Sequence, residues 1–97
     1  MQNSAFQATR DGNTISVAGQ LDFQTASSAL NEVVELMQAP GNLTIDLAGV
    51  SRSNSAGLAL LIEWLAIAKR QDRQLSFTNI PDSLRQISSV CQVDTLI

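Results

Sequence analysis

The sequence predicts an α/β protein with the element order β-β-α-β-α-β-α and a four-stranded mixed sheet packed with helices. Two observations favour this class. Short segments in which apolar residues alternate are followed by longer segments in which apolar residues recur every three or four positions. Turn-forming residues such as Gly, Pro and Asn stand between these segments. Because strands that alternate with helices need crossover connections, most strands should be parallel, and the 97 residues should form one domain, 1–97.

The first half of the chain predicts a hairpin followed by one helix. Residues near Ser4 to Arg10 and Thr14 to Leu21 are predicted strands, and the pair Asp11-Gly12 between them favours a tight antiparallel turn. From Gln24 to Gln38 the apolar residues fall on one side of a helix, which stops at Ala-Pro-Gly-Asn in positions 39–42. An antiparallel edge therefore precedes the first helix.

The second half predicts two strands that alternate with two helices. Leu43 to Leu47 alternates like a strand, and a helix from about Ser55 to Arg70 follows it. Gln74 to Thr78 is the last predicted strand, and Pro81 opens a shorter helix after it. This order favours parallel pairing of the later strands.

The central helix is more apolar than a surface helix needs to be. Leu60, Trp64 and Ile67 form an additional stripe at positions i, i+4 and i+7. This stripe must be covered either by neighbouring helices of the same chain or by a partner. Ala59 lies on the remaining arc, where a small side chain would let another protein approach the helix closely. An ordinary solvated face is the alternative for that arc.

Composition narrows the possible functions. The chain has no His, and its single cysteine, Cys91, excludes an internal disulfide and a multi-cysteine zinc site and is expected to fill the core. The net charge is −3 and the six basic residues are scattered, so we expect no nucleic-acid binding. The apolar run 58–68 is too short to span a bilayer, and the N-terminus lacks the features of a secretory signal. We expect a soluble cytoplasmic protein that holds no metal or cofactor and does not insert into the membrane.

Two polar loops are expected to meet at one edge of the sheet. The loop Gly19 to Thr25 follows the second strand, the loop Ala48 to Gly57 follows the third, and adjacent parallel strands end at the same edge. Asp22 is a good N-cap for the first helix, and Ser53 or Asn54 can cap the central helix. Capping alone accounts for these polar residues, which leaves a structural role open beside a functional one.

Ser55 should lie at the N-terminus of the central helix, on the same surface as Asp22. A phosphoryl group on its hydroxyl would meet backbone N–H groups and the positive end of the helix dipole. The same group would bring nearly two negative charges into any protein interface over the loop. Ser55 is therefore a candidate phosphorylation site at which binding is switched.

Two motifs in these loops resemble those of the STAS domain, a fold shared by bacterial anti-sigma-factor antagonists and the cytoplasmic domains of sulfate transporters. Residues 19–26, Gly-Gln-Leu-Asp-Phe-Gln-Thr-Ala, resemble the family's Gly-Glu-Leu-Asp-x-x-Thr-Ala. Residues 53–58, Ser-Asn-Ser-Ala-Gly-Leu, resemble its Asp-Ser/Thr-x-Gly-Leu phosphorylation loop. The phosphorylatable hydroxyl of the family falls on Ser55, and Asn54 stands where an acidic residue normally precedes it. With the matching element order, the resemblance spans nearly the whole chain.

Within the family, residues 57–61 and 68–71 are most similar to the small STAS subunits of Mla-type phospholipid transporters. The resemblance implies a non-catalytic accessory subunit, cytoplasmic and peripheral to the inner membrane through its partner. That partner would be the MlaF-like ATPase subunit of an ABC transporter, in a complex with permease and substrate-binding subunits that moves lipids between the inner and outer membranes. The residues expected to contact the partner are Asp22, Phe23, Ser53, Asn54, Ser55, Ala56 and Ala59.

Two other classes of function compete with this interpretation. An anti-sigma-factor antagonist would capture a kinase when Ser55 is free and release it when Ser55 is phosphorylated, although Asn54 and the central helix argue against it. A small enzyme that uses Asp22 with Ser55 is the third class. A serine nucleophile needs a positioned base, and a solvated carboxylate is a poor base at neutral pH. We therefore expect binding rather than catalysis.

Overall fold

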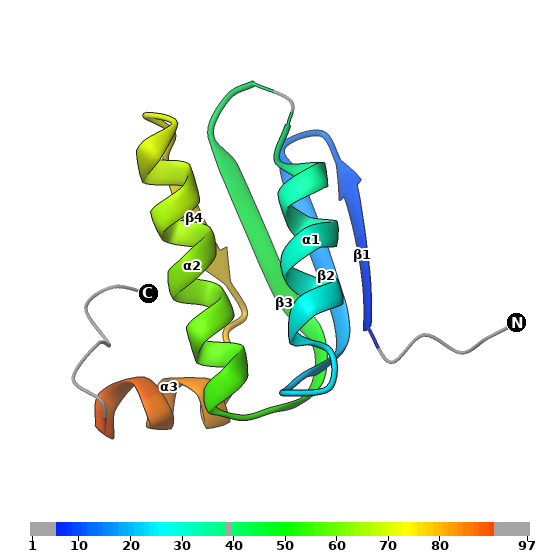
Figure 1. Cartoon of the computed structure of the whole chain (residues 1–97), viewed down its shortest axis with the longest axis vertical. Helices are drawn as coiled ribbons and strands as arrows, with labels where there is room; N and C mark the ends of the chain where they lie inside the picture. Colours follow the sequence, from blue (N-terminus) through cyan, green and yellow to red (C-terminus); the bar gives the residue numbers. More distant parts are fainter. Residues whose placement is uncertain (1–5, 39, 91–97) are drawn as a thin grey trace, which may run out of the picture.

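The structure is a computed structural model that describes residues 6–38 and 40–90. Seven elements follow one another in the predicted order (Figure 1). The predicted fold class is therefore confirmed. The elements are β1 (Phe6–Asp11), β2 (Thr14–Leu21), α1 (Ala26–Leu36), β3 (Leu43–Ser53), α2 (Ser55–Arg70), β4 (Leu75–Thr78) and α3 (Asp82–Val90).

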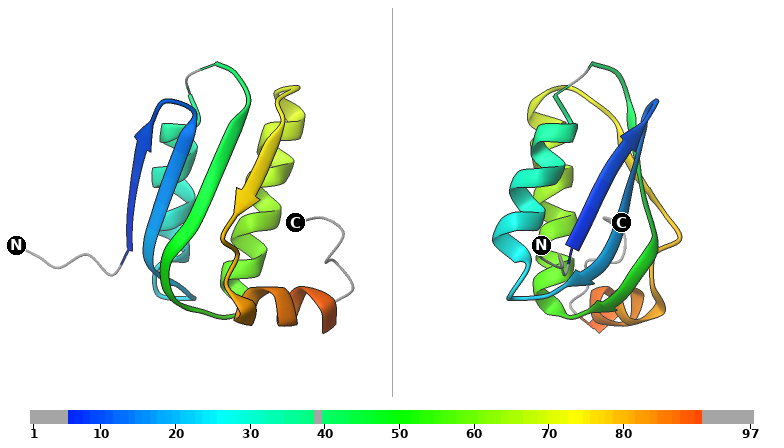
Figure 2. Two further views of the ribbon diagram at one scale, coloured as in Figure 1. Left: turned by 180° about the vertical axis from the view of Figure 1, so that it is seen from behind. Right: turned by 90° about the vertical axis from the view of Figure 1, so that its right-hand side faces the viewer.

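One mixed sheet forms the centre of the fold. Its strands lie in the order β1-β2-β3-β4, with β1 antiparallel to β2 and the other neighbours parallel. Helices α1 and α2 cover the same face of this sheet, while α3 lies across the end at which β2 and β3 finish (Figure 2). Both crossover helices therefore begin at that end, and the loops that precede them lie there too.

The hairpin confirms the predicted antiparallel edge. Asp11 pairs with Thr14, and Gly12 takes a φ of 60°, a left-handed conformation that costs glycine little. The strand is described from Phe6 onward, and its predicted start, Ser4, lies outside the described residues. The turn is held by Arg10, whose guanidinium Nε donates to the Gly12 carbonyl at 2.7 Å.

The core lies between the sheet and the two helices. The apolar stripe on α2 belongs to this core, because Leu60 and Trp64 are 5% and 0% exposed and Ile67 is half-buried against them. Neighbouring elements of the same chain therefore cover the stripe. The other large side chains with less than 2% exposure are Ile15, Leu21, Met37, Ile45, Leu47, Leu61 and Leu84.

Strand β3 is longer than its sequence pattern predicts. Its predicted end is Leu47, but it continues to Ser53, so most of the expected loop from Ala48 to Gly57 is strand. Backbone pairing with β2 carries the strand this far, since Leu21 still pairs with Ser53, with register shifts along the way. The alternation of apolar residues, which predicts strands, does not reveal this segment. Backbone hydrogen bonds rather than apolar side chains hold it in the sheet.

The remaining differences are small or concern other parts of the chain. Helix α1 is two residues shorter at each end than predicted, and β4 starts one residue later. Cys91, expected in the core, lies outside the described residues. In residues 6–38 and 40–90, none of the helices has both the length and the apolar character that crossing a bilayer requires.

Candidate functional site

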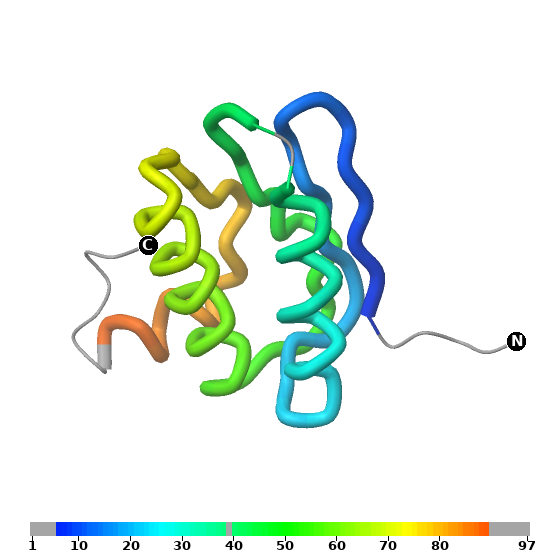
Figure 3. The backbone as a smooth tube through the Cα atoms, turned by 45° about the horizontal axis from the view of Figure 1, so that its top comes forward, coloured from blue at the N-terminus to red at the C-terminus, as the bar shows by residue number. Residues whose placement is uncertain are grey.

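The two predicted loops meet where β2 and β3 end, an edge of the sheet that we call the carboxyl edge. Leu21 and Ser53, the last residues of these strands, are partners in the parallel ladder. The backbone N–H of Asn54 donates to the Leu21 carbonyl at 3.3 Å, so the start of α2 is tied to the end of β2. The turn before α1 and the start of α2 lie at the same end of the molecule (Figure 3). The expected convergence of the loops is confirmed.

The turn before α1 is closed by Asp22 and Thr25. The Asp22 carboxylate accepts the backbone N–H groups of Gln24 at 3.0 Å and Thr25 at 3.1 Å. The Thr25 hydroxyl is buried, donates to the Gln20 carbonyl at 2.8 Å and accepts the Asp22 N–H at 3.1 Å. Asp22 was expected to be the N-cap of α1, but that position belongs to Thr25, which makes no side-chain cap bond. Asp22 instead holds the turn that precedes α1, because its bonds to the N–H groups of residues 24 and 25 form an Asx turn.

Asn54 and Ser53 have different partners at the start of α2. Asn54 is the N-cap: its backbone is extended, and its side-chain oxygen accepts the N–H of Ala56 at 2.9 Å. The Ser53 hydroxyl instead shares a hydrogen bond of 2.7 Å with the hydroxyl of Ser83 on α3. Ser55 follows as the first residue of α2 and is exposed. Of the two predicted caps, Asn54 performs the role, while Ser53 links β3 to α3.

Gly57 lets α2 approach the end of β2 closely. A Cβ placed on Gly57 would lie 2.8 Å from the Leu21 carbonyl oxygen and 3.1 Å from the Leu21 Cβ. These distances are shorter than ordinary contacts, so a side chain here would push the helix away from the strand. The glycine of the second motif therefore has a packing role.

An apolar groove, which we call the helix groove, runs between α1 and α2 from the carboxyl edge. Phe23 stands at its mouth and is 75% exposed, the one large hydrophobic side chain so exposed in the described part of the chain. Ala59 is exposed in the groove wall, whereas Ala56 is only 8% exposed and forms part of the floor. The groove is lined chiefly by Phe23, Ala26, Leu30, Ala59, Leu60 and Glu63.

A polar hollow adjoins the helix groove, and Phe23 lines both. Its other lining residues include Asp22, Asn54 and Arg52. Arg52 is exposed near the end of β3, where it pairs with Gln20 of β2. The structure therefore brings Asp22, Phe23 and Asn54 together with an arginine that sequence reasoning missed. The sequence offers only a weak indication of Arg52, which is a single basic residue directly before the second motif.

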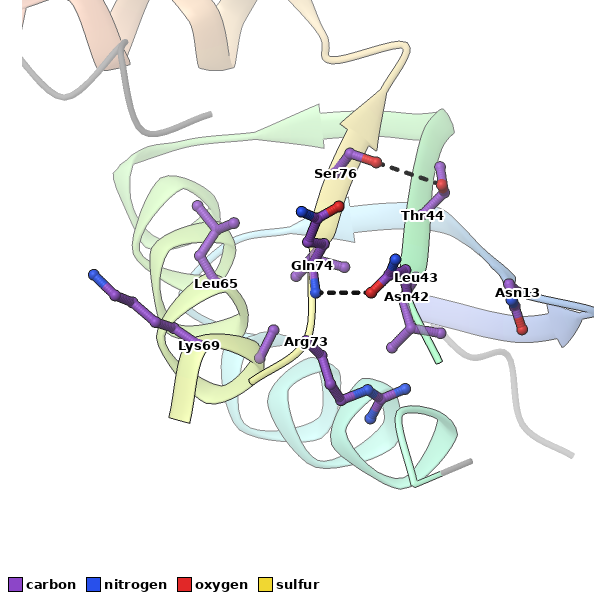
Figure 4. Close-up of a pocket in the computed structure, with 11 residues that line it drawn as sticks. Asn13, Asn42, Leu43, Thr44, Leu65, Lys69, Arg73, Gln74 and Ser76 are labelled. Carbon is purple, nitrogen blue, oxygen red and sulfur yellow. Dashed lines mark hydrogen bonds between the residues drawn. The ribbon is translucent and has the colours of Figure 1, made fainter. Parts of the chain in front are cut away.

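A larger hollow lies at the opposite edge of the sheet, which we call the amino edge (Figure 4). Some of its polar side chains are bound to the surrounding loops and strands, whereas Lys69 is exposed. The Arg73 guanidinium donates to the carbonyls of Gly41, at 2.8 Å, and Met37, and Asn42 accepts the Gln74 N–H at 3.1 Å. Arg10 similarly donates to the Leu36 carbonyl at 2.7 Å. The bonds of Arg10 and Arg73 satisfy carbonyls at the end of α1 and in the loop after it, so these two arginines have a structural role.

The clearest pKa shift among the described residues is that of Asp46, which lies on β3 between the two edges. A side-chain hydrogen bond from Asn79 and a backbone hydrogen bond from Ala48, each 2.9 Å long, hold the pKa of this carboxyl below its ordinary value of 3.8. Both bonds stabilise the charged carboxylate. Among the residues that the structure describes, no three or more His, Cys, Asp or Glu side chains gather in a way that could hold a metal ion.

Comparisons with known proteins agree with this architecture. The family model described as "Mlab, STAS domain" matches residues 4–97. The Escherichia coli K12 intermembrane phospholipid transport system binding protein MlaB is 32% identical over 79 residues, which are 81% of this chain and 79% of that protein. Among solved structures, an anti-sigma factor antagonist from Mycobacterium paratuberculosis is 19% identical with a TM-score of 0.69, over 95% of this chain and 80% of that one. A crystal structure of Mglu is also 19% identical, with a TM-score of 0.61 over 78% of this chain, and the chain spans only 20% of its length.

Proposed function

This chain belongs to the STAS-domain family that includes MlaB, and we propose that it is a non-catalytic accessory subunit of an ABC-type phospholipid transport system. In this role it binds the ATPase subunit and supports the assembly and activity of the transporter. The proposal takes the transport system from the name of the 32% identical relative. In this role the chain would lie on the cytoplasmic side of the inner membrane, held there by its partner.

The carboxyl edge is the surface that we assign to the ATPase subunit, and the exposure of Phe23 is the observation that carries the assignment. A phenylalanine that is 75% exposed beside an apolar groove loses contact with water when a protein covers it. Ser55 and Ala59 are exposed along the same edge and the same groove. Aromatic side chains surrounded by polar groups are typical of the central residues of protein interfaces.

The polar residues of the site favour binding over catalysis. The Asp22 carboxylate already accepts two backbone N–H groups, and the Asn54 side chain caps α2. Both side chains therefore fix the shape of the edge. Of the predicted contact residues, Asp22, Phe23, Asn54, Ser55, Ala56 and Ala59 fit this surface, whereas Ser53 is bound to α3 and acts through the position of that helix.

Co-purification with the transporter ATPase tests this assignment. Ser55→Glu should abolish the complex, because it places a larger and negatively charged side chain on the proposed interface. The protein should remain folded, since an acidic residue in the first turn of a helix is favourable by about 0.3–1 kcal/mol. Ser28→Glu is the matched control: Ser28 is also an exposed serine in the first turn of a helix, but it lies on α1, whereas Ser55 stands between Asn54 and Ala56, which line the polar hollow and the groove. An unchanged yield of complex with Ser55→Glu would contradict the assignment.

An anti-sigma-factor antagonist is the second candidate, and the exposed hydroxyl of Ser55 is the observation that favours it. The likeness to the mycobacterial antagonist, at 19% identity, supports the shared fold alone. This candidate requires stoichiometric phosphate on Ser55 after incubation with a cognate kinase. Intact-mass measurement of the wild type and of Ser55→Ala distinguishes the two functions, because the transporter subunit needs no such modification.

A further inference from the structure

We propose that the carboxyl edge selects one kind of partner segment: an amphipathic α-helix that lays apolar side chains in the helix groove and presents a carboxylate to Arg52. This inference rests on the proposed function, since the helix would belong to the ATPase subunit. It adds the chemistry by which the partner is recognised and the direction in which its helix lies.

The dimensions of the groove suit a helix. Along α2 the groove extends from Ala56 to Glu63, which at 1.5 Å per residue is about 10 Å, or two turns. A helix laid along it would offer apolar side chains at i and i+4 to a wall made of small and apolar residues such as Ala59 and Leu30. Phe23 at the mouth would pack against the same apolar side chains. The groove therefore offers a partner helix a surface that is apolar apart from Ser27 and Glu63.

Arg52 supplies the charge next to this groove. Within residues 6–38 and 40–90, its side chain makes no ion pair or hydrogen bond, although it is exposed and lines the polar hollow beside Phe23. Arg10 and Arg73 differ, because their guanidinium groups donate to backbone carbonyls. The nearby Asp22 carboxylate accepts two N–H groups of its own turn. A guanidinium without a partner is suited to a carboxylate, which it binds through two parallel hydrogen bonds.

The two ends of the groove differ in the charge that they offer to a partner, because Arg52 is, among the residues that the structure describes, the one cation that lines the groove or the polar hollow. Arg52 lies in the hollow beyond Phe23, whereas Glu63 lines the far end of the groove and is 3.8 Å from Arg70. A partner helix with its carboxylate toward Arg52 is attracted, and the reverse direction would bring that carboxylate toward Glu63. Because the Glu63 carboxylate is already paired with Arg70, that end attracts a partner carboxylate less than Arg52 does, and this difference favours one direction of binding.

The test compares two charge reversals by titration calorimetry against the purified ATPase subunit of the transporter from the same organism. Arg52→Glu should raise the Kd at least about tenfold, because it sets two negative charges against each other. Arg85→Glu is the control: Arg85 is an exposed arginine on α3 that lines neither the groove nor the polar hollow, and its reversal should change the Kd by less than about threefold. Circular dichroism verifies that both variants keep the wild-type fold.

A second measurement identifies the carboxylate. Each Asp and Glu on the surface helices of the ATPase subunit is changed singly to Lys and titrated with Arg52→Glu. One of these changes should restore at least about half of the lost binding free energy, as expected for a directly paired charge. If none restores binding, or if Arg52→Glu binds as well as Arg85→Glu, the inference is wrong while the proposed function stands. If the wild-type chain fails to bind the ATPase subunit at all, the proposed function itself is wrong.

Discussion

The two edges of the sheet use their charged and polar side chains in different ways. At the amino edge, Arg10 and Arg73 donate to carbonyl oxygens at the end of α1 and in the neighbouring loop. At the carboxyl edge, Asp22 and Asn54 hold the backbone, but Phe23 and Arg52 remain exposed beside them. The larger hollow lies at the amino edge. The engagement of side chains, rather than the size of a hollow, therefore distinguishes the amino edge from the carboxyl edge to which we assign the partner.

The close packing beneath the carboxyl edge gives the largest expected effect. Gly57→Val should lower the free energy of unfolding by about 2–3 kcal/mol, because its Cβ would collide with the Leu21 carbonyl. Urea denaturation followed by circular dichroism measures the change. Ala59→Val, an exposed position on the same helix, should cost only about 0.5 kcal/mol of helix propensity. Equal losses in the two variants would show that the edge is not tightly packed.

A pair of arginine substitutions tests the comparison directly. Arg73→Met should lower the free energy of unfolding by about 2 kcal/mol, since carbonyls at the end of α1 lose a charged donor. Arg52→Met should change stability by less than about 0.5 kcal/mol, because the side chain is exposed and holds no part of the described fold. Both values come from urea denaturation. In a binding assay the order of the two variants should reverse, because Arg52→Met should bind the ATPase subunit more weakly than Arg73→Met does. A large loss of stability from Arg52→Met would refute the distinction between the edges.

The buried hydroxyl of Thr25 sharpens the account of the first motif. Thr25→Val keeps the shape of the side chain but removes its bonds to Gln20 and Asp22, which should cost about 1–2 kcal/mol of stability. Thr25→Ser retains the hydroxyl and should lose less. Thermal unfolding of the three proteins gives this order, and a Thr25→Val protein as stable as the wild type would mean that the turn does not depend on the hydroxyl.

A small effect is expected from Asp46, whose carboxylate already accepts two hydrogen bonds. Its pKa is lowered in the folded state, so it stabilises the fold above its ordinary pKa of 3.8, and this contribution is lost as the pH falls through the lowered value. Asp46→Asn should therefore be less stable than the wild type at pH 7, by less than about 1 kcal/mol for a group near solvent. Urea denaturation should show the difference shrinking below about pH 4. A difference that grows toward low pH would contradict this assignment of the hydrogen bonds.

The fold was largely predictable because its apolar residues follow the periods of strands and helices. The spacing of Leu60, Trp64 and Ile67 is that of a helix, as found in α2, and the parallel order of β2 and β3 places Asp22 and Asn54 at one edge. The elements that were predicted best are those in which buried side chains dominate the local pattern. Their order alone was enough to locate the carboxyl edge.

What could not be predicted depends on backbone bonds and on distant neighbours. Ser51, Arg52 and Ser53 have no strand-like alternation of apolar residues, yet they extend β3 because its backbone pairs with β2. The place of Arg52 beside Phe23 follows from this extension, so it could not be recognised beforehand. Thr25, rather than the predicted Asp22, is the N-cap of α1. Its position depends on a bond to the carbonyl of Gln20, five residues before it.

The burial of Trp64 has a practical consequence for solution studies. It is the one tryptophan of the chain, it is fully covered, and its indole N–H has no hydrogen-bond partner among the residues that the structure describes. An indole in such dry surroundings should emit at short wavelength and resist quenching by iodide. Its fluorescence should therefore change when the protein unfolds. A protein that docks over Phe23 should leave the emission nearly unchanged.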